Sequence, residues 1–249
     1  MPRYPSSSPR TLTYQFGPGP ITPVVKLLIW TNVGLFVLSW LMPSIVGYLG
    51  LQPDAVFSRL FFWQPVTYMF LHAGIVHILF NMLALWMFGV ELERLWGRTF
   101  FLKYYFVTGI GAAATTLILA LVPGGFGAAI RYTVTVGASG AIYGLLLAYA
   151  LCFPNRPIYV WALFPIPARY FVVIMGAIAL MSSIGGDQGG VANSAHLGGL
   201  VFGYLYLKVW RPRPLAEIKY RYVKWRMNRL RSKFDVYKGG RNDWDRHVH

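Results

Sequence analysis

Residues 135–151 read TVGASGAIYGLLLAYAL, an apolar run typical of a membrane-spanning helix with a small polar side chain near its start. That side chain is Ser139, within Gly137-Ala138-Ser139-Gly140. Two interpretations are open at this point. Small residues let two membrane helices pack closely, and a serine hydroxyl can bond to its own helix. Alternatively, Ser139 is a nucleophile, which requires a base supplied by another part of the chain.

The composition indicates a membrane protein. Of the 249 residues, 56% are hydrophobic and 12% are charged, with a mean hydropathy of +0.48. Soluble domains carry about 25% charged residues. Cys152 is the single cysteine, which excludes an intrachain disulfide and a Cys-x-x-Cys motif. We therefore predict an all-α polytopic membrane protein, most of it in one membrane domain.

Six apolar stretches, separated by proline, glycine and charged residues, predict six spans. They cover about residues 21–42, 74–90, 99–122, 132–151, 170–184 and 191–210. The predicted organisation is an N-terminal tail at 1–20, a six-helix membrane bundle at 21–210 and a basic tail at 211–249. The long connection at 43–73 is rich in aromatic residues, which are favoured in the headgroup layer of a bilayer.

The positive charges predict the orientation. The net charge is +15, from 23 Lys and Arg residues against eight acids. With six spans, Arg59 and Arg131 are the two basic residues that fall on one side, and the rest fall on the side of both termini. The positive-inside rule places that side in the cytoplasm. The charge is then an orientation signal, with anionic lipids as a partner of the basic tail, and no nucleic-acid partner is expected.

Three spans carry polar side chains at a similar expected depth. Counting from the predicted span starts, Asn81 and Ser139 lie about seven residues in and His196 about five, which is roughly 8–10 Å below the surface opposite the termini. His77 lies four residues before Asn81, so both share one helix face. Ionisable residues inside spans are costly and often functional. Each residue alone also has a structural interpretation, as a satisfied core histidine or as an interhelical hydrogen bond.

Small residues predict which helices meet. His196 is followed by Gly199 and Gly203, a small-xxx-small face that allows close helix packing. The fourth span has a matching face in Gly137, Gly140 and Gly144. If these faces meet, His196 comes within reach of Ser139, and Tyr143, one turn further along, packs against the imidazole. The pair is then a nucleophile with its base.

These residues resemble the rhomboid family of intramembrane serine proteases, over nearly all of residues 21–210. The matching motifs are His72-x4-His77-x3-Asn81, Gly137-Ala138-Ser139-Gly140 and Ala195-His196-x2-Gly199-x3-Gly203. Glu93 and Arg94, after the second span, are also similar to the family pattern. The chain departs from it at Trp63-Gln64, where many members carry Trp-Arg. That departure puts the polar network of the first long loop in doubt.

The resemblance implies a rhomboid-like bundle with a Ser-His dyad. Ser139 would be the nucleophile and His196 the general base, without a carboxylate. The oxyanion would be held by the Ser139 backbone N–H, His77 and Asn81. The supporting residues would be Tyr143, Gly137, Gly199, Gly203 and, at the periphery, His72. No cofactor or metal is implied.

The resemblance further implies that single-span membrane proteins are cut near the outer face, in a bacterial inner membrane. The loop at 185–191 would act as a lid and the fifth span as a lateral gate. One alternative is a catalytically inactive relative that binds membrane clients, although such relatives usually lack the serine or the histidine. A small-solute transporter is disfavoured, because its polar residues would line a path to both faces.

Overall fold

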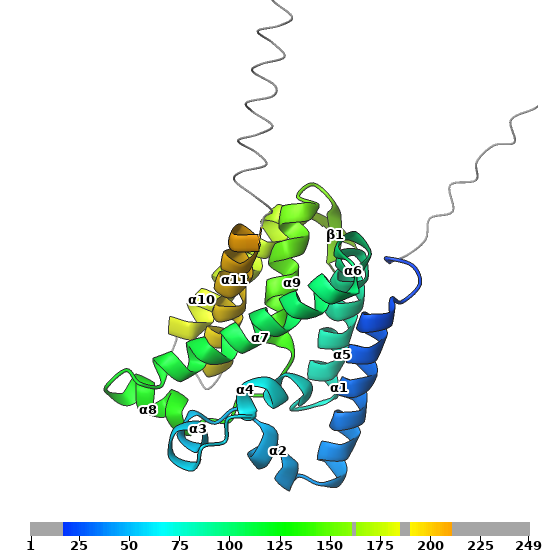
Figure 1. Cartoon of the computed structure of the whole chain (residues 1–249). Coiled ribbons are helices and arrows are strands. Elements are labelled where there is room, and N and C mark those ends of the chain that lie inside the picture. The colour runs from blue at the N-terminus through cyan, green and yellow to red at the C-terminus, as the bar shows by residue number, and fades with distance from the viewer. Residues whose placement is uncertain (1–16, 161–162, 185–189, 211–249) are drawn as a thin grey trace, which may run out of the picture. The chain divides into compact units, whose positions relative to one another are not determined.

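The computed structural model describes residues 17–160, 163–184 and 190–210 (Figure 1). The predicted lid at 185–191 falls largely outside these residues, as do the tail at 211–249 and most of the tail at 1–20. Three helices are long and apolar enough to cross a membrane: Pro23–Leu41, Ile75–Trp96 and Arg98–Leu119. Two shorter apolar helices cover Ser139–Cys152 and Ala168–Ser183. The chain is therefore an integral membrane protein with a helical bundle.

Helical segments in the described part of the chain fall on all six predicted spans. They are α1 (Pro23–Leu41), the continuous run of α5 (Ile75–Ala84), η2 (Leu85–Gly89) and α6 (Val90–Trp96), α7 (Arg98–Leu119), α9 (Ser139–Cys152), α10 (Ala168–Ile184) and α11 (Gly190–Trp210). Helix α9 packs against α5, α7 and α10. It is apolar along its length and its buried side includes Ala141, Leu145 and Ala148. The serine-bearing helix therefore lies inside the bundle.

Short helices connect the long ones at one end of the bundle, which we call the serine end. They are α2 (Ser44–Leu49), α3 (Pro53–Arg59), α4 (Gln64–Thr67), the 3-10 turn η1 (Tyr68–Phe70) and α8 (Gly125–Tyr132) (Figure 1). Asp54 of α3 forms an ion pair with Arg131 of α8, with 3.0 Å between Oδ1 and Nε. The two connections that were predicted to share one side of the membrane are thus in contact.

The opposite end, which we call the hairpin end, carries the strands β1 (Pro157–Val160) and β2 (Phe164–Pro167) (Figure 1). They are antiparallel, with Ile158 opposite Ile166 and Val160 opposite Phe164. The proline-rich connection between α9 and α10 was not predicted to form strands. Proline lacks an N–H donor and is tolerated in short edge strands of this kind. In the part of the chain that the structure describes, this hairpin is the one β-sheet, and the other elements are helices.

The helix that carries His77 contains a π turn, η2, at Leu85–Gly89. In a π turn one extra residue is inserted into the helical ladder, and such turns are frequent near functional sites. Gly89 lies at the end of this turn, where an added Cβ would come within 3.0 Å of Val25 and 3.2 Å of Phe101. The absence of a side chain at Gly89 therefore lets α1 and α7 approach the turn.

The Glu93 cluster joins α6 to the start of α1 at the hairpin end. The buried Glu93 carboxylate accepts hydrogen bonds from the Thr22 hydroxyl at 2.5 Å and from the backbone N–H groups of Val24 at 3.1 Å and Val25 at 3.0 Å. The first N–H groups of a helix lack partners within it, and a carboxylate there also complements the helix dipole. Glu93 therefore acts as the N-terminal cap of a helix about 70 residues away in sequence.

The predicted start of the fourth span was wrong. Helix α9 begins at Ser139, whereas the hydropathy pattern placed the span start near Tyr132. Residues 133–138 are non-helical, and Thr135 pairs with Leu51 in an antiparallel bridge. The sequence Thr133-Val134-Thr135-Val136 is rich in β-branched residues, which favour extended backbone. Ser139 therefore stands at the N-terminus of its helix and not two turns inside it.

Candidate active site

Ser139 and His196 are in hydrogen-bonding contact. The distance between Ser139 Oγ and His196 Nε2 is 2.7 Å, and it links the first residue of α9 to α11. For the hydroxyl to donate, Nε2 must be unprotonated, which we assign as the neutral imidazole with its proton on Nδ1. Among the described residues His196 Nδ1 has no hydrogen-bond partner. The arrangement is a hydroxyl and a base without an orienting carboxylate.

Tyr143 lies flat against the His196 ring. The ring centroids are 4.3 Å apart and the planes differ by 4°. Ser139 and Tyr143 are one helical turn apart on α9, so one face of this helix contacts both an edge and the face of the imidazole. Stacking of this kind restricts rotation of the ring, which gives the imidazole the orientation that a carboxylate supplies in a Ser-His-Asp triad.

Glycines allow α9 and α11 to touch. A Cβ placed on Gly199 would lie 1.9 Å from the Gly140 carbonyl oxygen, so only a hydrogen fits at this crossing. A Cβ on Gly203 would lie 2.6 Å from the Tyr104 hydroxyl, which itself donates to the Gly144 carbonyl at 2.7 Å. The close approach of these two faces, predicted from the glycine spacing, is therefore present and brings the histidine to the serine.

The turn before Ser139 also requires glycine. Gly137 has φ = 130°, a conformation that L side chains rarely adopt. A Cβ at this position would also lie 2.9 Å from the His77 ring, on the side of Cε1 and Nε2. The Gly137 N–H donates to the Tyr68 carbonyl at 2.9 Å. Gly137 therefore sets the direction in which the chain enters α9 and leaves room for His77 beside Ser139.

His77 presents a donor towards the turn before Ser139. Its Nδ1 accepts the Ala73 N–H at 3.4 Å, which favours the tautomer with a proton on Nε2. The Ser139 N–H is one of the N-terminal amides that an α-helix leaves without an internal partner. Two donors thus converge beside the Ser139 hydroxyl, where a carbonyl oxygen that gains negative charge would be stabilised.

Asn81 and His72 each contact His77. The Asn81 amide nitrogen donates to the His77 carbonyl one turn earlier, at 2.8 Å, so it bonds to its own helix. Its place among the oxyanion donors stays a prediction. His72 is buried, and its ring meets that of His77 edge-on with centroids 5.1 Å apart. Burial lowers the pKa of His72 to about 3, so this ring is neutral.

The acidic residues of the described segments are used elsewhere. Asp54 pairs with Arg131, Glu91 pairs with Arg156 at the hairpin end, and Glu93 caps α1. Within the same segments, no group of three or more His, Cys, Asp or Glu side chains could hold a metal ion. The groups described above around Ser139 are its own hydroxyl, the imidazoles of His196 and His77, and backbone amides.

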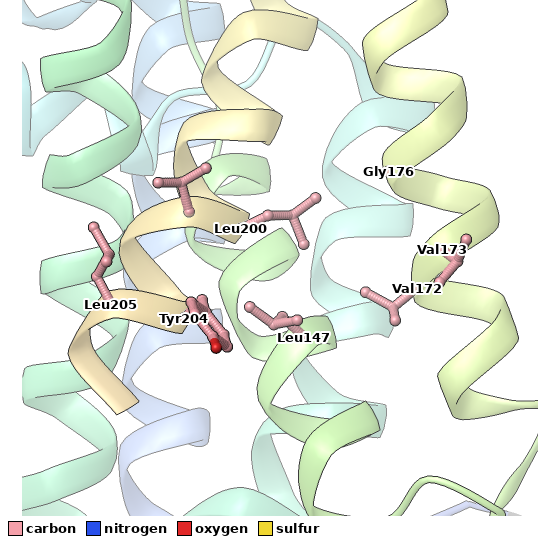
Figure 2. A pocket seen from close by; sticks show the side chains of 8 residues that line it. Leu147, Val172, Val173, Gly176, Leu200, Tyr204 and Leu205 are labelled. Carbon is pink, nitrogen blue, oxygen red and sulfur yellow. The ribbon is translucent and has the colours of Figure 1, made fainter. Parts of the chain in front are cut away.

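An apolar groove of about 420 Å³ lies beside this site, between α9, α10 and α11 (Figure 2). Its lining includes Leu147, Gly176 and Leu200, and Figure 2 shows these helices around a space between their side chains. Leu147 is eight residues after Ser139, or about 12 Å further along α9. The groove is thus a feature of the bundle next to the hydroxyl–imidazole pair and does not include it.

Two buried polar residues of the loop at 43–73 were not among the predicted site residues. Tyr68 carries the carbonyl that binds Gly137, and its hydroxyl donates to the Gly109 carbonyl at 2.7 Å. Burial raises the pKa of the Tyr68 hydroxyl, so it remains a donor. Gln64 is fully buried, and it is the residue at which the sequence departs from the Trp-Arg pattern of the family. Only the aromatic richness of 43–73 and the Trp63-Gln64 departure marked this region in the sequence.

Fold and site together define a helical membrane protein with a serine and a histidine in contact near one end of its bundle. The model of the Rhomboid domain matches residues 60–213, which is more than half of the chain. The chain therefore belongs to the rhomboid family.

Several proteins of this family are similar in sequence. Rhomboid protease GluP of Bacillus subtilis is 30% identical, over 62% of this chain and 27% of its own length. Rhomboid protein 1, mitochondrial, of Saccharomyces cerevisiae is 30% identical, over 74% of this chain and 52% of its own length. Rhomboid protease AarA of Providencia stuartii is 32% identical, over 57% of this chain and 54% of its own length. The matched region thus spans from about a quarter to about half of these relatives.

Proposed function

We propose that this protein is an intramembrane serine endopeptidase that cleaves single-span membrane proteins through a dyad of Ser139 and His196. The observation that carries the proposal is the 2.7 Å contact between Oγ and Nε2, in a chain of the rhomboid family. The relatives named as proteases support the same activity.

The first half of the reaction forms an acyl-enzyme. His196 Nε2 takes the Ser139 proton as Oγ attacks the substrate carbonyl, and the carbonyl oxygen becomes negative. The Ser139 N–H and the His77 Nε2–H are the donors nearest to this oxygen, with Asn81 as a third after rotation of its amide. One such donor is typically worth about 3–4 kcal/mol of transition-state stabilisation. The histidine then gives its proton to the leaving amine.

The second half of the reaction needs water at the same atoms. His196, neutral again, removes a proton from water as the water oxygen attacks the acyl carbonyl. The imidazolium then returns this proton to Ser139 Oγ as the bond between Oγ and the acyl carbon breaks. The position of Ser139 at the first residue of α9 supports this step, because an N-terminal residue is nearer to the end of the bundle than a residue within the helix. A helical substrate must also unwind locally, because a helix occupies its carbonyls with internal hydrogen bonds.

The route of the substrate and the orientation of the chain are further parts of the proposal. A substrate helix would enter laterally beside α10, which has an open apolar groove on its α9 and α11 side. The serine end would face the periplasm of a bacterial inner membrane, with both termini cytoplasmic. The distribution of Lys and Arg residues supports that orientation. Reporter fusions at the two termini and in the 43–73 loop test it.

A fluorophosphonate probe together with a model single-span substrate tests the function. The purified protein should be labelled and should cleave the substrate, and Ser139→Ala should abolish both. Labelling that survives in Ser139→Ala would assign the reactive hydroxyl elsewhere. An unlabelled wild-type protein that still binds single-span clients would instead favour the inactive, client-binding alternative.

A further inference from the structure

The segment that leads into Ser139 is held by hydrogen bonds from the first long loop. The Leu51 N–H donates to the Thr135 carbonyl at 2.9 Å, and the Thr135 N–H donates to the Leu51 carbonyl at 2.8 Å. Two residues later, the Gly137 N–H donates to the Tyr68 carbonyl. Residues 133–138 belong to no helix, so these bonds fix their backbone. The placement of the Ser139 hydroxyl therefore depends on the placement of this loop.

Gln64 is the buried centre of that loop. Its side chain is fully buried, and Oε1 accepts the Gln52 N–H at 3.0 Å. Its Nε2 lies 3.4 Å from the Gly47 carbonyl and 3.3 Å from the Tyr48 carbonyl and donates towards both. One carboxamide thus joins both ends of the turn at 47–52. Leu51, which pairs with the segment before the serine, lies inside this turn.

The other links between the loop and this segment are more exposed. Gln52 Nε2 donates to the Tyr132 carbonyl at 3.2 Å. The Asp54–Arg131 ion pair has side chains that are 26% and 39% exposed, and ion pairs at that exposure contribute little. Water can replace a lost partner at these positions but not at a fully buried amide. Among the side chains that make these links, Gln64 is the one that is fully buried.

From these contacts we infer that Gln64 is a positioning residue for Ser139, acting through the Leu51–Thr135 pairing. The inference rests on the proposed function for its effect on catalysis, but the contacts themselves do not depend on it. A carboxamide is needed because it supplies an acceptor and two donors at once. Many members of the rhomboid family carry arginine at this position, and an arginine side chain has no acceptor for the Gln52 N–H. This chain therefore holds its loop by a different set of bonds.

Gln64→Met and Gln64→Arg test the inference in the full-length protein. Both variants leave the Gln52 N–H without its acceptor. The kcat for the model substrate and the rate of fluorophosphonate labelling should fall about tenfold, because small misplacements of reacting groups are costly. The KM should change less than twofold. Gln64→Asn is the second variant if these fail to insert, and it should show the same loss because its shorter side chain cannot span the turn.

Two matched controls separate positioning from a general loss of stability. Trp63→Phe removes an indole donor to the same Tyr48 carbonyl, 2.9 Å away, but leaves the Gln52 N–H bonded, so kcat should stay within twofold of wild type. Asn32→Leu removes a buried amide of α1 that bonds to its own helix. The inference is overturned if Gln64→Met lowers kcat no more than Asn32→Leu at equal unfolding temperature.

Hydrogen exchange provides a measurement that does not depend on activity. The Thr135 and Gly137 amides should exchange at least about tenfold faster in Gln64→Met than in wild type, and should be unchanged in Asn32→Leu. Unchanged exchange at both amides in Gln64→Met overturns the inference even if the enzyme is active. If both amides exchange faster in Gln64→Met but the fluorophosphonate probe does not label the wild-type protein, the positioning by Gln64 stands and the proposed function is refuted.

Discussion

The Glu93 carboxylate is buried and the Ser139–His196 pair is part-buried in the helical bundle, and the two groups are satisfied to different degrees. Glu93 accepts three hydrogen bonds, two of them from the first backbone amides of α1. His196 uses one ring nitrogen on Ser139, and its other nitrogen has no partner in the described part of the chain. Buried polar groups are normally paired, so an unpaired one calls for a reason. The Glu93 cluster therefore stabilises the fold, whereas the Ser139–His196 pair keeps a nitrogen that is available for a further hydrogen bond.

Removal of the imidazole should have the largest effect on activity and a small one on stability. We expect His196→Ala to lower kcat by at least about 10³-fold, since a nucleophile without its base is weak. The unfolding temperature in detergent should change less than in Glu93→Ala. Cleavage of the model substrate and thermal unfolding measure the two effects. The comparison fails if His196→Ala unfolds more readily than Glu93→Ala.

Separation of α9 from α11 should remove activity while the protein still inserts. Gly199→Val places atoms where the Gly140 carbonyl stands, so the helices must move apart and the 2.7 Å contact is lost. We expect a loss of about 100-fold or more in kcat. Gly34→Val in α1 is the matched control, because a Cβ at Gly34 meets no atom within 4 Å. Full activity in purified Gly199→Val would refute the close-packing argument.

Acidification should inactivate the enzyme by protonating its base. His196 must be neutral to accept the Ser139 proton, and an ordinary imidazole has a pKa of about 6.5. Below the pKa of His196, kcat should therefore fall about tenfold for each pH unit. A profile of initial rate between pH 4 and 9, with unfolding followed in parallel, measures it. A rate that rises steadily towards pH 5 would contradict a neutral imidazole base.

Substitution of Glu93 should lower stability and leave kcat nearly unchanged, the opposite of the result expected for His196. Glu93→Gln keeps the shape of the side chain but weakens three charge-assisted hydrogen bonds at the start of α1. We expect a loss of about 1–3 kcal/mol in stability, seen as a lower unfolding temperature. The kcat per folded molecule should stay within twofold of wild type, because Glu93 lies at the hairpin end. A tenfold loss of kcat in folded Glu93→Gln would show that Glu93 also supports activity, which contradicts this prediction.

The smallest effect should come from the Tyr143 hydroxyl. The Tyr143 ring stacks on His196, and this stacking does not involve the phenol oxygen. Tyr143→Phe should therefore change kcat less than twofold. Tyr143→Leu, which removes the stack, should lower it about tenfold, in line with an aromatic pair worth about 0.5–1.5 kcal/mol. Equal kcat values for the two variants would show that stacking does not orient the imidazole.

The contact between Ser139 and His196 could be predicted because it follows from helical periodicity. The spacing of Gly199 and Gly203 and the four-residue step from Ser139 to Tyr143 each define a helix face. The amide direction of Asn81 could not be predicted in this way. Spacing fixes the face of a residue but not its rotamer, and the Asn81 amide turns to its own helix. The catalytic roles of these residues stay predictions.

The start of α9 was predicted wrongly because hydropathy does not distinguish an extended apolar segment from a helix. Residues 133–138 pair with Leu51, a contact that is distant in sequence and carries no local signal beyond the β-branched residues. The contacts of Gln64 and Glu93 could not be predicted from the sequence, for a related reason. Each satisfies backbone groups of another element, and no pattern around Gln64 or Glu93 specifies which amides it will meet.

The π turn at Leu85–Gly89 lies between two contacts of one continuous helical run, that of His77 with the turn before Ser139 and that of Glu93 with the start of α1. Glu93 lies 16 residues after His77, which in an uninterrupted α-helix would leave the two side chains roughly 160° apart, and the extra residue of the π turn lowers this angle to roughly 60°. The π turn thus absorbs one residue while the two ends of this helical run keep the relative direction of a regular helix, so deleting a single residue from the turn should leave both contacts in place.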